Sequence, residues 1–336
     1  MTRTIGWGLL GTGGICRAFA EALADEPRGA TLVAVGSRDG ARAQAFADAE
    51  RARHPQVRAH ASYESLVADP QVELVYVGTP HADHAASARL ALAAGKAVLC
   101  EKAFTLTRAE AESLVALAHK QRVFLMEAMW TRFLPAIAAV RRLVDEGAIG
   151  EPLTLQADFG FDCSELPATH RVLDPALGGG ALLDLGIYPL SLASFLVGPI
   201  TGVHAQAEVG PTGVDLHTAF MLSHANGGLS QGLCSLRSTT PWRALLLGTA
   251  GRIEIDSPFF HAGGFTLHRP GQPPSTQSLP HVGNGYAHQV AHVNECLREG
   301  RLESPVMPLD ESVALMGWMD AIRTQVGVRY PQEIGG

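Results

Sequence analysis

The sequence of 336 residues lacks the features of several functional classes. It has only five cysteines, which are widely scattered and form no CxxC pair, so we expect reduced thiols in a cytoplasmic protein. The net charge of −7 leaves no basic surplus and argues against nucleic-acid binding. We expect no apolar run to reach the ~18 residues of a membrane helix. The first strand-like run starts within five residues of the N-terminus, so a signal peptide is not expected either.

Motifs for metal binding and nucleophilic catalysis are also missing. His81 and His84 lie three residues apart, and His288 and His292 lie four apart, but no HExxH motif or third ligand accompanies either pair. No GxSxG motif is present, and none of the cysteines has a clear activating partner. We therefore expect no metal and no covalent nucleophile.

The first 128 residues alternate between strand-like and helix-like periods. Short apolar runs are expected to form strands at about 4–11, 30–37, 72–79, 97–100 and 123–128. Helical patterns separate these strands, and Thr107 with Glu110 has the spacing of a capping box. Strands that alternate with helices predict βαβ units and an α/β Rossmann domain, with a doubly wound parallel sheet. We assign residues 1–128 to this dinucleotide-binding domain.

Beyond residue 128 the pattern changes to that of an α+β domain. A helical pattern at 135–147 precedes a strand-like run at 152–161, and several further strand-length runs lie between about 200 and 270. This pattern predicts a large open, mostly antiparallel sheet, with two helices at the end of the chain. We assign residues 129–336 to a domain for substrate binding and oligomerisation, whose last helix can pack back on the first domain.

A glycine-rich turn follows the first predicted strand. The segment from Gly11 to Cys16 fits the G-x-G-x-x-G/A fingerprint, with Cys16 as the small third residue. Gly11 permits a tight turn, Gly13 lets the backbone approach a pyrophosphate, and a helix that begins near Gly14 points its N–H groups at the anion. We predict that Gly11, Thr12, Gly13, Gly14 and Ile15 bind a dinucleotide.

The end of the second predicted strand selects the dinucleotide. An NAD site usually has an acidic residue there, but this strand ends in Ser37 and Arg38, with Arg42 soon after. Arg38 can hold a 2′-phosphate and stack on adenine. We predict NADP as the cofactor, and because Asp39 lies one residue further on, NAD stays possible.

A lysine stands where a buried strand ends, in Val98–Thr107. Ligands of doubly wound sheets sit beyond the carboxyl ends of the strands, so Lys102 is expected to project towards the nicotinamide half of the cofactor. A lysine can move the proton of a substrate hydroxyl itself, or lower the pKa of a neighbouring phenol. Other residues at these strand ends are predicted to bind the cofactor: Thr79, Pro80, His84 and Glu101.

A candidate phenol occurs in the apolar segment 178–191. Asp184 and Tyr188 are spaced four residues apart, so both lie on one face if the segment is helical. A core tyrosine is the alternative on spacing alone. Near the domain junction, Trp130 is a candidate to line the substrate pocket, and Arg132 is a candidate to bind cofactor phosphate. Further along the chain, Phe159 and Phe161 are candidates to line an apolar pocket. Packing roles are their alternatives.

These segments together resemble the Gfo/Idh/MocA oxidoreductases over nearly the whole chain. The resemblance lies in residues 8–16, 77–103, 124–136, 178–188 and 296–309. Family members place the lysine of an E-K-P motif beside the nicotinamide. Glu101 and Lys102 match its first two positions, and Ala103 stands in place of proline. Tyr188 and Asp184 match a tyrosine and an aspartate of the branch that oxidises dihydrodiols and D-xylose with NADP.

The resemblance implies a dehydrogenase of sugars or vicinal diols. Tyr188 would be the acid/base and Lys102 would stabilise its tyrosinate, whereas Asp184 would orient substrate or tyrosine. It also implies a homodimer or higher homo-oligomer that forms through the antiparallel sheet. Alternatives are a different sugar or inositol dehydrogenase, an anhydro-keto-sugar reductase, and a non-catalytic NADP-sensing protein.

Overall fold

The structure is a computed structural model that describes residues 3–26 and 29–334. It contains two compact units. The first combines the described residues up to Trp130 with Val282–Met316, and the second combines Thr131–His281 with the described residues from Gly317 on. The domain boundary at 128/129 stays a prediction, and the chain returns to the first unit at Val282.

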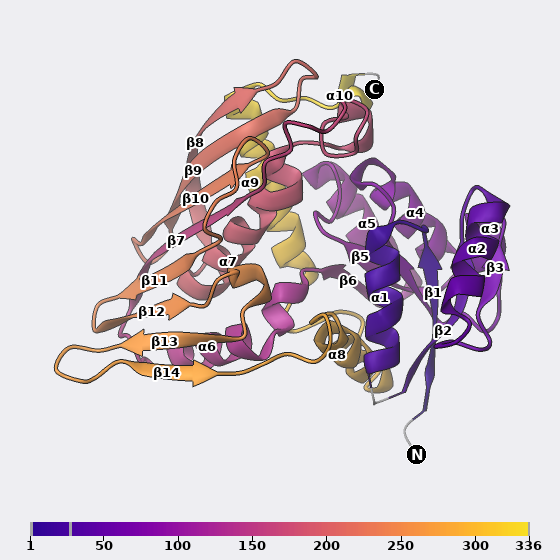
Figure 1. The fold of residues 1–336 in the computed structure, drawn as a ribbon, viewed down its shortest axis with the longest axis horizontal. Helices are drawn as coiled ribbons and strands as arrows, with labels where there is room; N and C mark the ends of the chain where they lie inside the picture. Colours follow the sequence, from indigo (N-terminus) through magenta and orange to yellow (C-terminus); the bar gives the residue numbers. More distant parts are fainter. Residues whose placement is uncertain (1–2, 27–28, 335–336) are drawn as a thin grey trace. The chain divides into compact units, whose positions relative to one another are not determined.

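The first unit is built on a six-stranded sheet with the order β3-β2-β1-β4-β5-β6 (Figure 1). All of its strand pairs are parallel, which confirms the predicted doubly wound sheet. The strands are β1 (Ile5–Leu10), β2 (Ala30–Gly36), β3 (Arg58–His60), β4 (Leu74–Val77), β5 (Ala97–Glu101) and β6 (Leu125–Ala128). The order reverses between β1 and β4, so a ligand crevice is expected beyond the carboxyl ends of these two strands.

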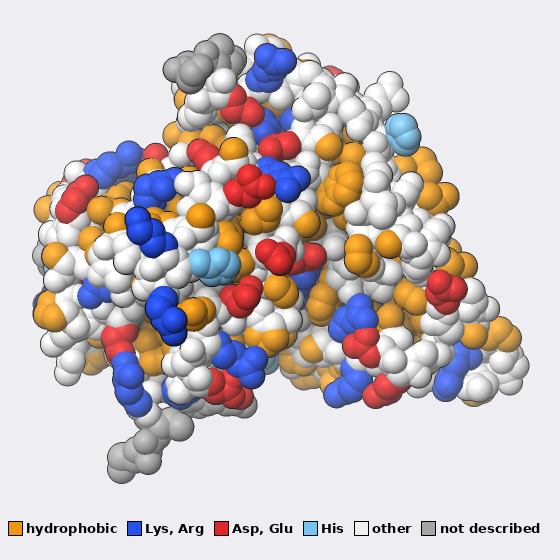
Figure 2. All heavy atoms as spheres, turned by 180° about the vertical axis from the view of Figure 1, so that it is seen from behind, with side chains coloured by type: hydrophobic (Ala, Val, Ile, Leu, Met, Phe, Trp, Pro, Cys, Tyr) orange, Lys and Arg blue, Asp and Glu red, His pale blue; other side chains and the backbone are white. Residues whose placement is uncertain are grey.

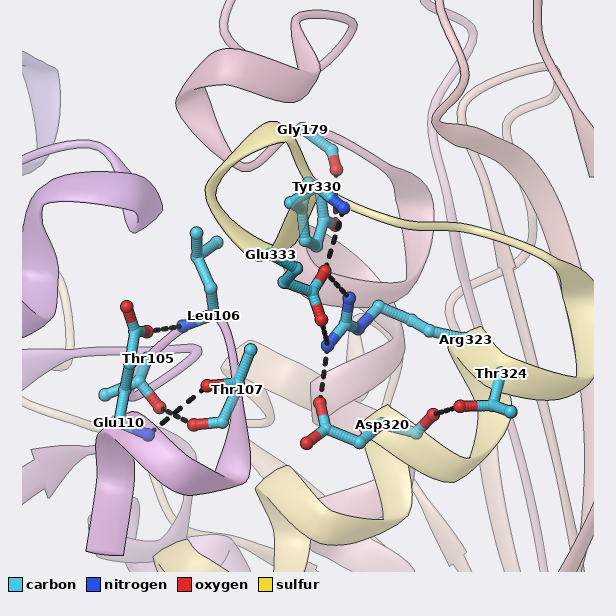
Figure 3. Close-up of polar contacts among 10 residues, drawn as sticks. All are labelled: Thr105, Leu106, Thr107, Glu110, Gly179, Asp320, Arg323, Thr324, Tyr330 and Glu333. Carbon is cyan, nitrogen blue, oxygen red and sulfur yellow. Dashed lines mark hydrogen bonds and ion pairs between the residues drawn. The ribbon is translucent and has the colours of Figure 1, made fainter. Parts of the chain in front are cut away.

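Helices cover this sheet in two groups. α1 packs with α8, whereas α3, α4 and α5 pack in succession, as expected when helices flank both faces. The helices are α1 (Gly14–Asp25), α2 (Gly40–Glu50), α3 (Tyr63–Val67), α4 (His81–Ala93), α5 (Arg108–Gln121) and α8 (Ala287–Arg298). The predicted capping box begins α5, but Glu110 reaches one residue further back: Thr107 Oγ1 accepts from the Glu110 N–H, and Glu110 accepts from the Leu106 N–H (Figure 3).

The second unit is built on an eight-stranded sheet with the order β14-β13-β12-β11-β7-β10-β9-β8. Only the β7–β10 pair is parallel among the described pairs, so the sheet is mostly antiparallel, as predicted. The strands are β7 (Pro152–Gly160), β8 (Ile200–Val209), β9 (Asp215–His224), β10 (Leu229–Ser235), β11 (Ala244–Gly248), β12 (Gly251–Ile255), β13 (Gly264–His268) and β14 (Ser275–Ser278).

One face of this sheet is buried and the other is open. In β9 the side chains of Phe220 and Leu222 are buried, whereas Met221 between them is 53% exposed. α7 (Ile187–Val197) packs on β7 and β10, and a π-helical turn, η3 (Leu182–Gly186), leads directly into it. The other helical segments are η1 (Trp130–Phe133), α6 (Pro135–Asp145), η2 (Pro175–Leu177), η4 (Phe259–His261), α9 (Leu309–Val326) and α10 (Pro331–Ile334).

One expectation about apolar runs is wrong. The segment Pro175–Val197 is long and apolar enough to cross a membrane by composition, with a mean hydropathy of 1.6 in an 18-residue window. In the structure, 89% of that window is buried inside the protein. A helix that is apolar on all sides is expected in the core of a large protein, which accounts for its composition.

The surface carries charges of both signs. On the face drawn in Figure 2, acidic and basic side chains are interspersed. Exposed ion pairs include Arg108 with Glu112 and Arg237 with Glu208. Pairs of this kind contribute little to stability, because water screens them and long side chains lose freedom.

Candidate active site

The turn between β1 and α1 has the geometry of an anion site. Gly11 has a φ of +114°, and a Cβ there would lie 2.8 Å from the carbonyl oxygen of Gly78. A Cβ on Gly13 or Gly14 would meet nothing within 4 Å, so the backbone faces open space at both positions. α1 begins without a side-chain cap, which leaves its first N–H groups to a ligand. These features fit the pyrophosphate of a dinucleotide.

The third position of the fingerprint has a packing role. Cys16 is fully buried, and a Cβ on Gly78 would come within 2.5 Å of its sulfur. The cysteine therefore closes the space between α1 and the end of β4. Burial raises the pKa of its thiol to about 12, which makes it unsuitable as a nucleophile. Thr12 and Ile15 lie in the same turn, both partly exposed.

The loop after β2 exposes a basic side chain, whereas the acidic residue next to it caps a helix. Asp39 caps α2, since its carboxylate accepts hydrogen bonds from the backbone N–H groups of Ala41 and Arg42. The Arg38 side chain is 71% exposed and pairs with Asp83 at 3.1 Å. The Asp39 carboxylate is thus committed to the helix, and the exposed basic side chains near this tip are Arg38 and Arg42.

The end of β4 places a buried hydroxyl at the crevice. Thr79 is 8% exposed, and its Oγ1 has no hydrogen-bond partner among the described residues. Such an atom is costly unless a ligand or water satisfies it. Pro80 follows as the N-cap residue of α4. The adjacent backbone is held by His84, whose ring nitrogens lie 3.0 Å from the carbonyl oxygen of Thr79 and 2.9 Å from that of Ala103.

His84 thereby bridges the loops after β4 and β5. Burial lowers the pKa of this histidine to about 4, so the ring is neutral near pH 7 and donates to one of the two carbonyls. The sequence predicted a cofactor contact for His84. The structure shows how this residue can shape the loop that presents Lys102.

The turn that carries Lys102 is held by two buried carboxylates. Glu101 accepts from the Tyr76 hydroxyl at 2.6 Å and from the Lys102 N–H at 3.2 Å. Glu127 accepts from the Phe104 N–H at 3.1 Å. The Lys102–Ala103 peptide between these contacts is cis. Glu101, predicted to bind cofactor, therefore orients the backbone around Lys102.

Tyr188 is the second residue of α7, and two long-range contacts fix the segment that leads into this helix. The buried Asp215 carboxylate accepts from the Leu182 N–H at 2.8 Å. Tyr330 donates to the Gly179 carbonyl at 2.7 Å, and Arg323 holds the tail that carries Tyr330 through an ion pair with Glu333 (Figure 3). These contacts connect the glycine turn before η3 to β9 and to the end of the chain.

Arg132 supports the same helix from another direction. Its Nε donates to the Ser191 hydroxyl and its terminal nitrogen to the Ser191 carbonyl, both at 3.0 Å. The guanidinium carbon lies 4.8 Å from the ring centre of Phe195. Arg132 is 3% exposed, so this arginine, predicted to bind cofactor phosphate, packs against α7 within the second unit.

Asp184 has an ion-pair partner that the sequence did not reveal. Its two carboxylate oxygens lie 3.1 and 3.3 Å from the two terminal nitrogens of Arg171, in a forked arrangement. Asp184 sits in the π-helical turn, and such turns are frequent at functional sites. A carboxylate held in this way suits an orienting role better than proton exchange.

Aromatic rings surround the Tyr188 side chain, which is 7% exposed. Phe159 meets it edge to face, with ring centres 5.1 Å apart. Phe260 lies 6.0 Å from Tyr188 and stacks on Phe159 at 3.9 Å. Phe259 and Phe260 were not singled out from the sequence, because the short helix η4 that carries them has no periodic pattern. The predicted substrate residue Phe159 therefore lies directly beside the candidate acid/base.

The remaining predicted residue, Trp130, is buried in the first unit. Its ring lies 4.5 Å from that of Tyr286. The structure places Lys102 and the predicted nucleotide-binding residues other than Arg132 in the first unit. It brings Asp184, Tyr188 and Phe159 together in the second. Across residues 3–26 and 29–334, no group of three or more His, Cys, Asp or Glu side chains could hold a metal ion.

Comparison with known proteins identifies the family. Residues 5–129 match the oxidoreductase family with an NAD-binding Rossmann fold, and residues 137–254 match the GFO/IDH/MocA C-terminal domain. The chain therefore belongs to the Gfo/Idh/MocA oxidoreductase family. It has an NAD(P)-binding domain and is a dehydrogenase acting on CH–OH groups.

Curated relatives and solved structures cover nearly the whole chain. The trans-1,2-dihydrobenzene-1,2-diol dehydrogenase of Mus musculus is 38% identical over 97% of this chain and 98% of its own. The D-xylose 1-dehydrogenase (NADP(+)) of Hypocrea jecorina is 33% identical over 98% and 94%. An aldose-aldose oxidoreductase from Caulobacter crescentus, complexed with glycerol, has a TM-score of 0.87 at 26% identity over 97% and 98%. A 3-ketoreductase from Actinomadura kijaniata with NADP has a TM-score of 0.79 at 26% identity over 96% and 98%.

Proposed function

We propose that the chain is an NADP-dependent dehydrogenase that transfers a hydride between nicotinamide and a sugar or vicinal diol. The observation that carries this proposal is a buried phenol, Tyr188, fixed at the start of α7 among aromatic rings. It occurs in a chain whose relatives are named dihydrodiol and D-xylose dehydrogenases. A substrate ring with adjacent hydroxyls, such as a sugar or a cyclic diol, fits such a pocket. The C–H face of the ring packs on aromatic side chains while one hydroxyl hydrogen-bonds to the phenol.

Each residue then has a distinct task. The glycine turn and Thr79 hold the dinucleotide, and Arg38 with Arg42 holds its 2′-phosphate. A bound nicotinamide supplies the position that accepts or donates the hydride. Tyr188 takes the proton of the reacting hydroxyl in oxidation and returns it in reduction. Lys102 stabilises the tyrosinate form of Tyr188, and Asp184, held by Arg171, orients the substrate or the tyrosine.

The direct test is turnover with a panel of substrates. Purified protein is incubated with NADP and D-xylose, D-glucose or trans-1,2-dihydrobenzene-1,2-diol, and NADPH absorbance at 340 nm is followed. Inositol and an anhydro-keto sugar represent the other reactions of the family. Turnover of a sugar or diol supports the proposal. Tight NADPH binding without turnover of any member of the panel would instead indicate a cofactor-sensing protein.

The choice of cofactor is tested at Arg38. Arg38→Gln is expected to raise the KM for NADP about 10- to 100-fold with little change for NAD, because a charge-assisted hydrogen bond to a phosphate contributes roughly 1.5–3 kcal/mol. Steady-state kinetics with both cofactors measure this effect. Arg89→Gln is the matched control, since Arg89 is an exposed arginine of α4 that donates to Ser113. An equal change with both cofactors would refute a 2′-phosphate site at Arg38.

We further propose that the protein is a homodimer or higher homo-oligomer formed through the open face of the large sheet. That face exposes Met221 and Leu229, at 53% and 50%. It also contains a hollow of about 790 Å³, lined by residues that include Gln156, Gln206 and Arg243. An apolar surface of this kind on a sheet is typical of an interface.

Met221→Arg is expected to convert the oligomer to monomer at micromolar concentration, because the burial of an unpaired charge opposes association. Light scattering coupled to size-exclusion chromatography gives the mass. Leu302→Arg changes an aliphatic residue of similar exposure in the first unit and is expected to leave the mass unchanged. A wild-type mass close to 35.5 kDa would contradict this proposal.

A cytoplasmic location stays a prediction.

A further inference from the structure

Trp242 has an unusual backbone conformation. Two non-glycine residues of the described chain have a positive φ, Arg122 at 53° and Trp242 at 58°. Arg122 ends α5 in the left-handed conformation, which is a common way to close a helix. Trp242 stands ahead of β11 with no helix to close. A bulky residue in this region is strained, and strained residues are concentrated at functional sites.

Three hydrogen bonds hold Trp242 in this conformation. Its backbone N–H donates to the Asp158 carboxylate at 2.8 Å, and its indole N–H donates to the Gly160 carbonyl at 2.8 Å. Its own carbonyl accepts from the Phe259 N–H at 2.9 Å. The indole is therefore oriented in advance by β7 and η4, the elements that also carry the aromatic neighbours of Tyr188.

The indole of Trp242 extends the cluster of aromatic side chains around Tyr188 towards solvent. Its ring centre lies 5.3 Å from that of Phe161 and 5.9 Å from that of Phe260. Phe161 lies 5.2 Å from Phe159, the residue that contacts Tyr188 edge to face. Exposure rises along this path, from 4% for Phe159 to 37% for Phe161, with Trp242 partly exposed. The path leads from the buried phenol to solvent.

We propose that Phe161 and Trp242 form an outer subsite for a second ring of the substrate, whose first ring reacts at Tyr188. The inference rests on the proposed function and specifies its substrate class as molecules with two linked or fused rings. The flat face of an aromatic side chain stacks equally on the apolar C–H face of a pyranose and on an aryl ring. The second ring can therefore be a sugar unit or a fused arene, and matched substrates distinguish them.

The test compares substrates that differ by one ring. Xylobiose against D-xylose probes a second sugar unit, and trans-1,2-dihydronaphthalene-1,2-diol against trans-1,2-dihydrobenzene-1,2-diol probes a fused arene. The subsite predicts a higher kcat/KM for the two-ring member of at least one pair. A wild-type enzyme that turns over substrates but prefers no two-ring member would overturn it.

Trp242→Gly removes the indole and leaves the backbone conformation unstrained, since glycine adopts a φ of 58° freely. It is expected to reduce the preference for two-ring substrates about 10-fold, mainly through KM, which corresponds to a stacking contribution of about 1.4 kcal/mol. Phe161→Ala removes an exposed ring and is expected to act in the same direction. Val209→Ala, at an exposed position of β8, is the control and is expected to leave the ratio unchanged. A ratio unaltered in both aromatic variants would refute the subsite.

A failure of the proposed function gives a different result. If the wild-type protein turns over none of the four substrates, calorimetry with xylobiose and D-xylose still measures binding. Tighter binding of xylobiose that is lost in Trp242→Gly and Phe161→Ala supports the subsite independently of catalysis. Equal affinities for the two sugars would exclude a subsite for a second sugar unit. Equal affinities for the two diols would likewise exclude a subsite for a fused arene.

Discussion

Replacement of Tyr188 by phenylalanine is expected to lower kcat and kcat/KM for the best substrate by about 10²–10⁴-fold, the usual contribution of a positioned acid/base. The substitution removes one oxygen and keeps the ring, so the contacts with Phe159 and Phe260 can persist. The KM for substrate is expected to change little, because the proton moves only as the transition state forms. Initial rates over a range of substrate concentrations separate the two parameters.

Two controls distinguish loss of chemistry from loss of structure. NADPH binding, followed by its fluorescence, should be unchanged, since the predicted dinucleotide-binding residues other than Arg132 lie in the first unit. The midpoint of thermal unfolding should also be nearly unchanged. A Tyr188→Phe protein that keeps wild-type kcat would exclude the phenol as the acid/base. It would direct attention to the Asp184–Arg171 pair or to Lys102 itself.

The parts of the site that depend on local sequence could be predicted. The glycine turn, the strand ends with Thr79 and Lys102, and the N-cap at Thr107 follow from a few neighbouring residues whose conformations are restricted by sterics and hydrogen bonding. The doubly wound order also follows, because alternating strands and helices allow few topologies. These predictions needed no knowledge of contacts between distant segments.

Contacts over long sequence separations could not be predicted. Asp215 reaches the Leu182 N–H from 33 residues away, and Tyr330 reaches Gly179 from 151 residues away. Nothing near either residue in the sequence indicates its partner. The strand β14 was missed for another reason. Its four residues, Ser275–Ser278, are all exposed, so no alternation of apolar and polar residues marks it.

The contacts of the charged residue Arg132 could not be predicted from the sequence either. An arginine at the junction of two domains suggested a phosphate ligand, and this role stays a prediction. In the structure its Nε and one terminal nitrogen donate to Ser191 within the second unit. A buried guanidinium needs several acceptors in a fixed geometry, and which segment supplies them depends on the tertiary fold. The sequence therefore predicts that such a residue matters without showing what it contacts.

Replacement of Lys102 by methionine is expected to lower kcat about 10²–10³-fold, as found when one preorganised electrostatic contact is removed from an active site. Methionine keeps much of the length and apolar character of the side chain, while Glu101 can still bind the backbone N–H at this position. An ammonium near a phenol favours the tyrosinate, so its loss should move the pH–rate profile for oxidation upward by roughly 1–3 pH units. Rates measured between pH 6 and 11 give this shift.

The upward shift separates two roles for the lysine. If Lys102 exchanged the substrate proton itself, Lys102→Met would abolish the pH-dependent limb instead of moving it, and added primary amines would be expected to restore part of the rate. If Lys102 acts through Tyr188, the pH-dependent part of the rate profile persists at higher pH in Lys102→Met and disappears only in Tyr188→Phe. Lys120→Met, at an exposed position near the end of α5, is the control for loss of a lysine and should leave both rate and profile unchanged. A Lys102→Met enzyme with the wild-type rate and profile would contradict both roles.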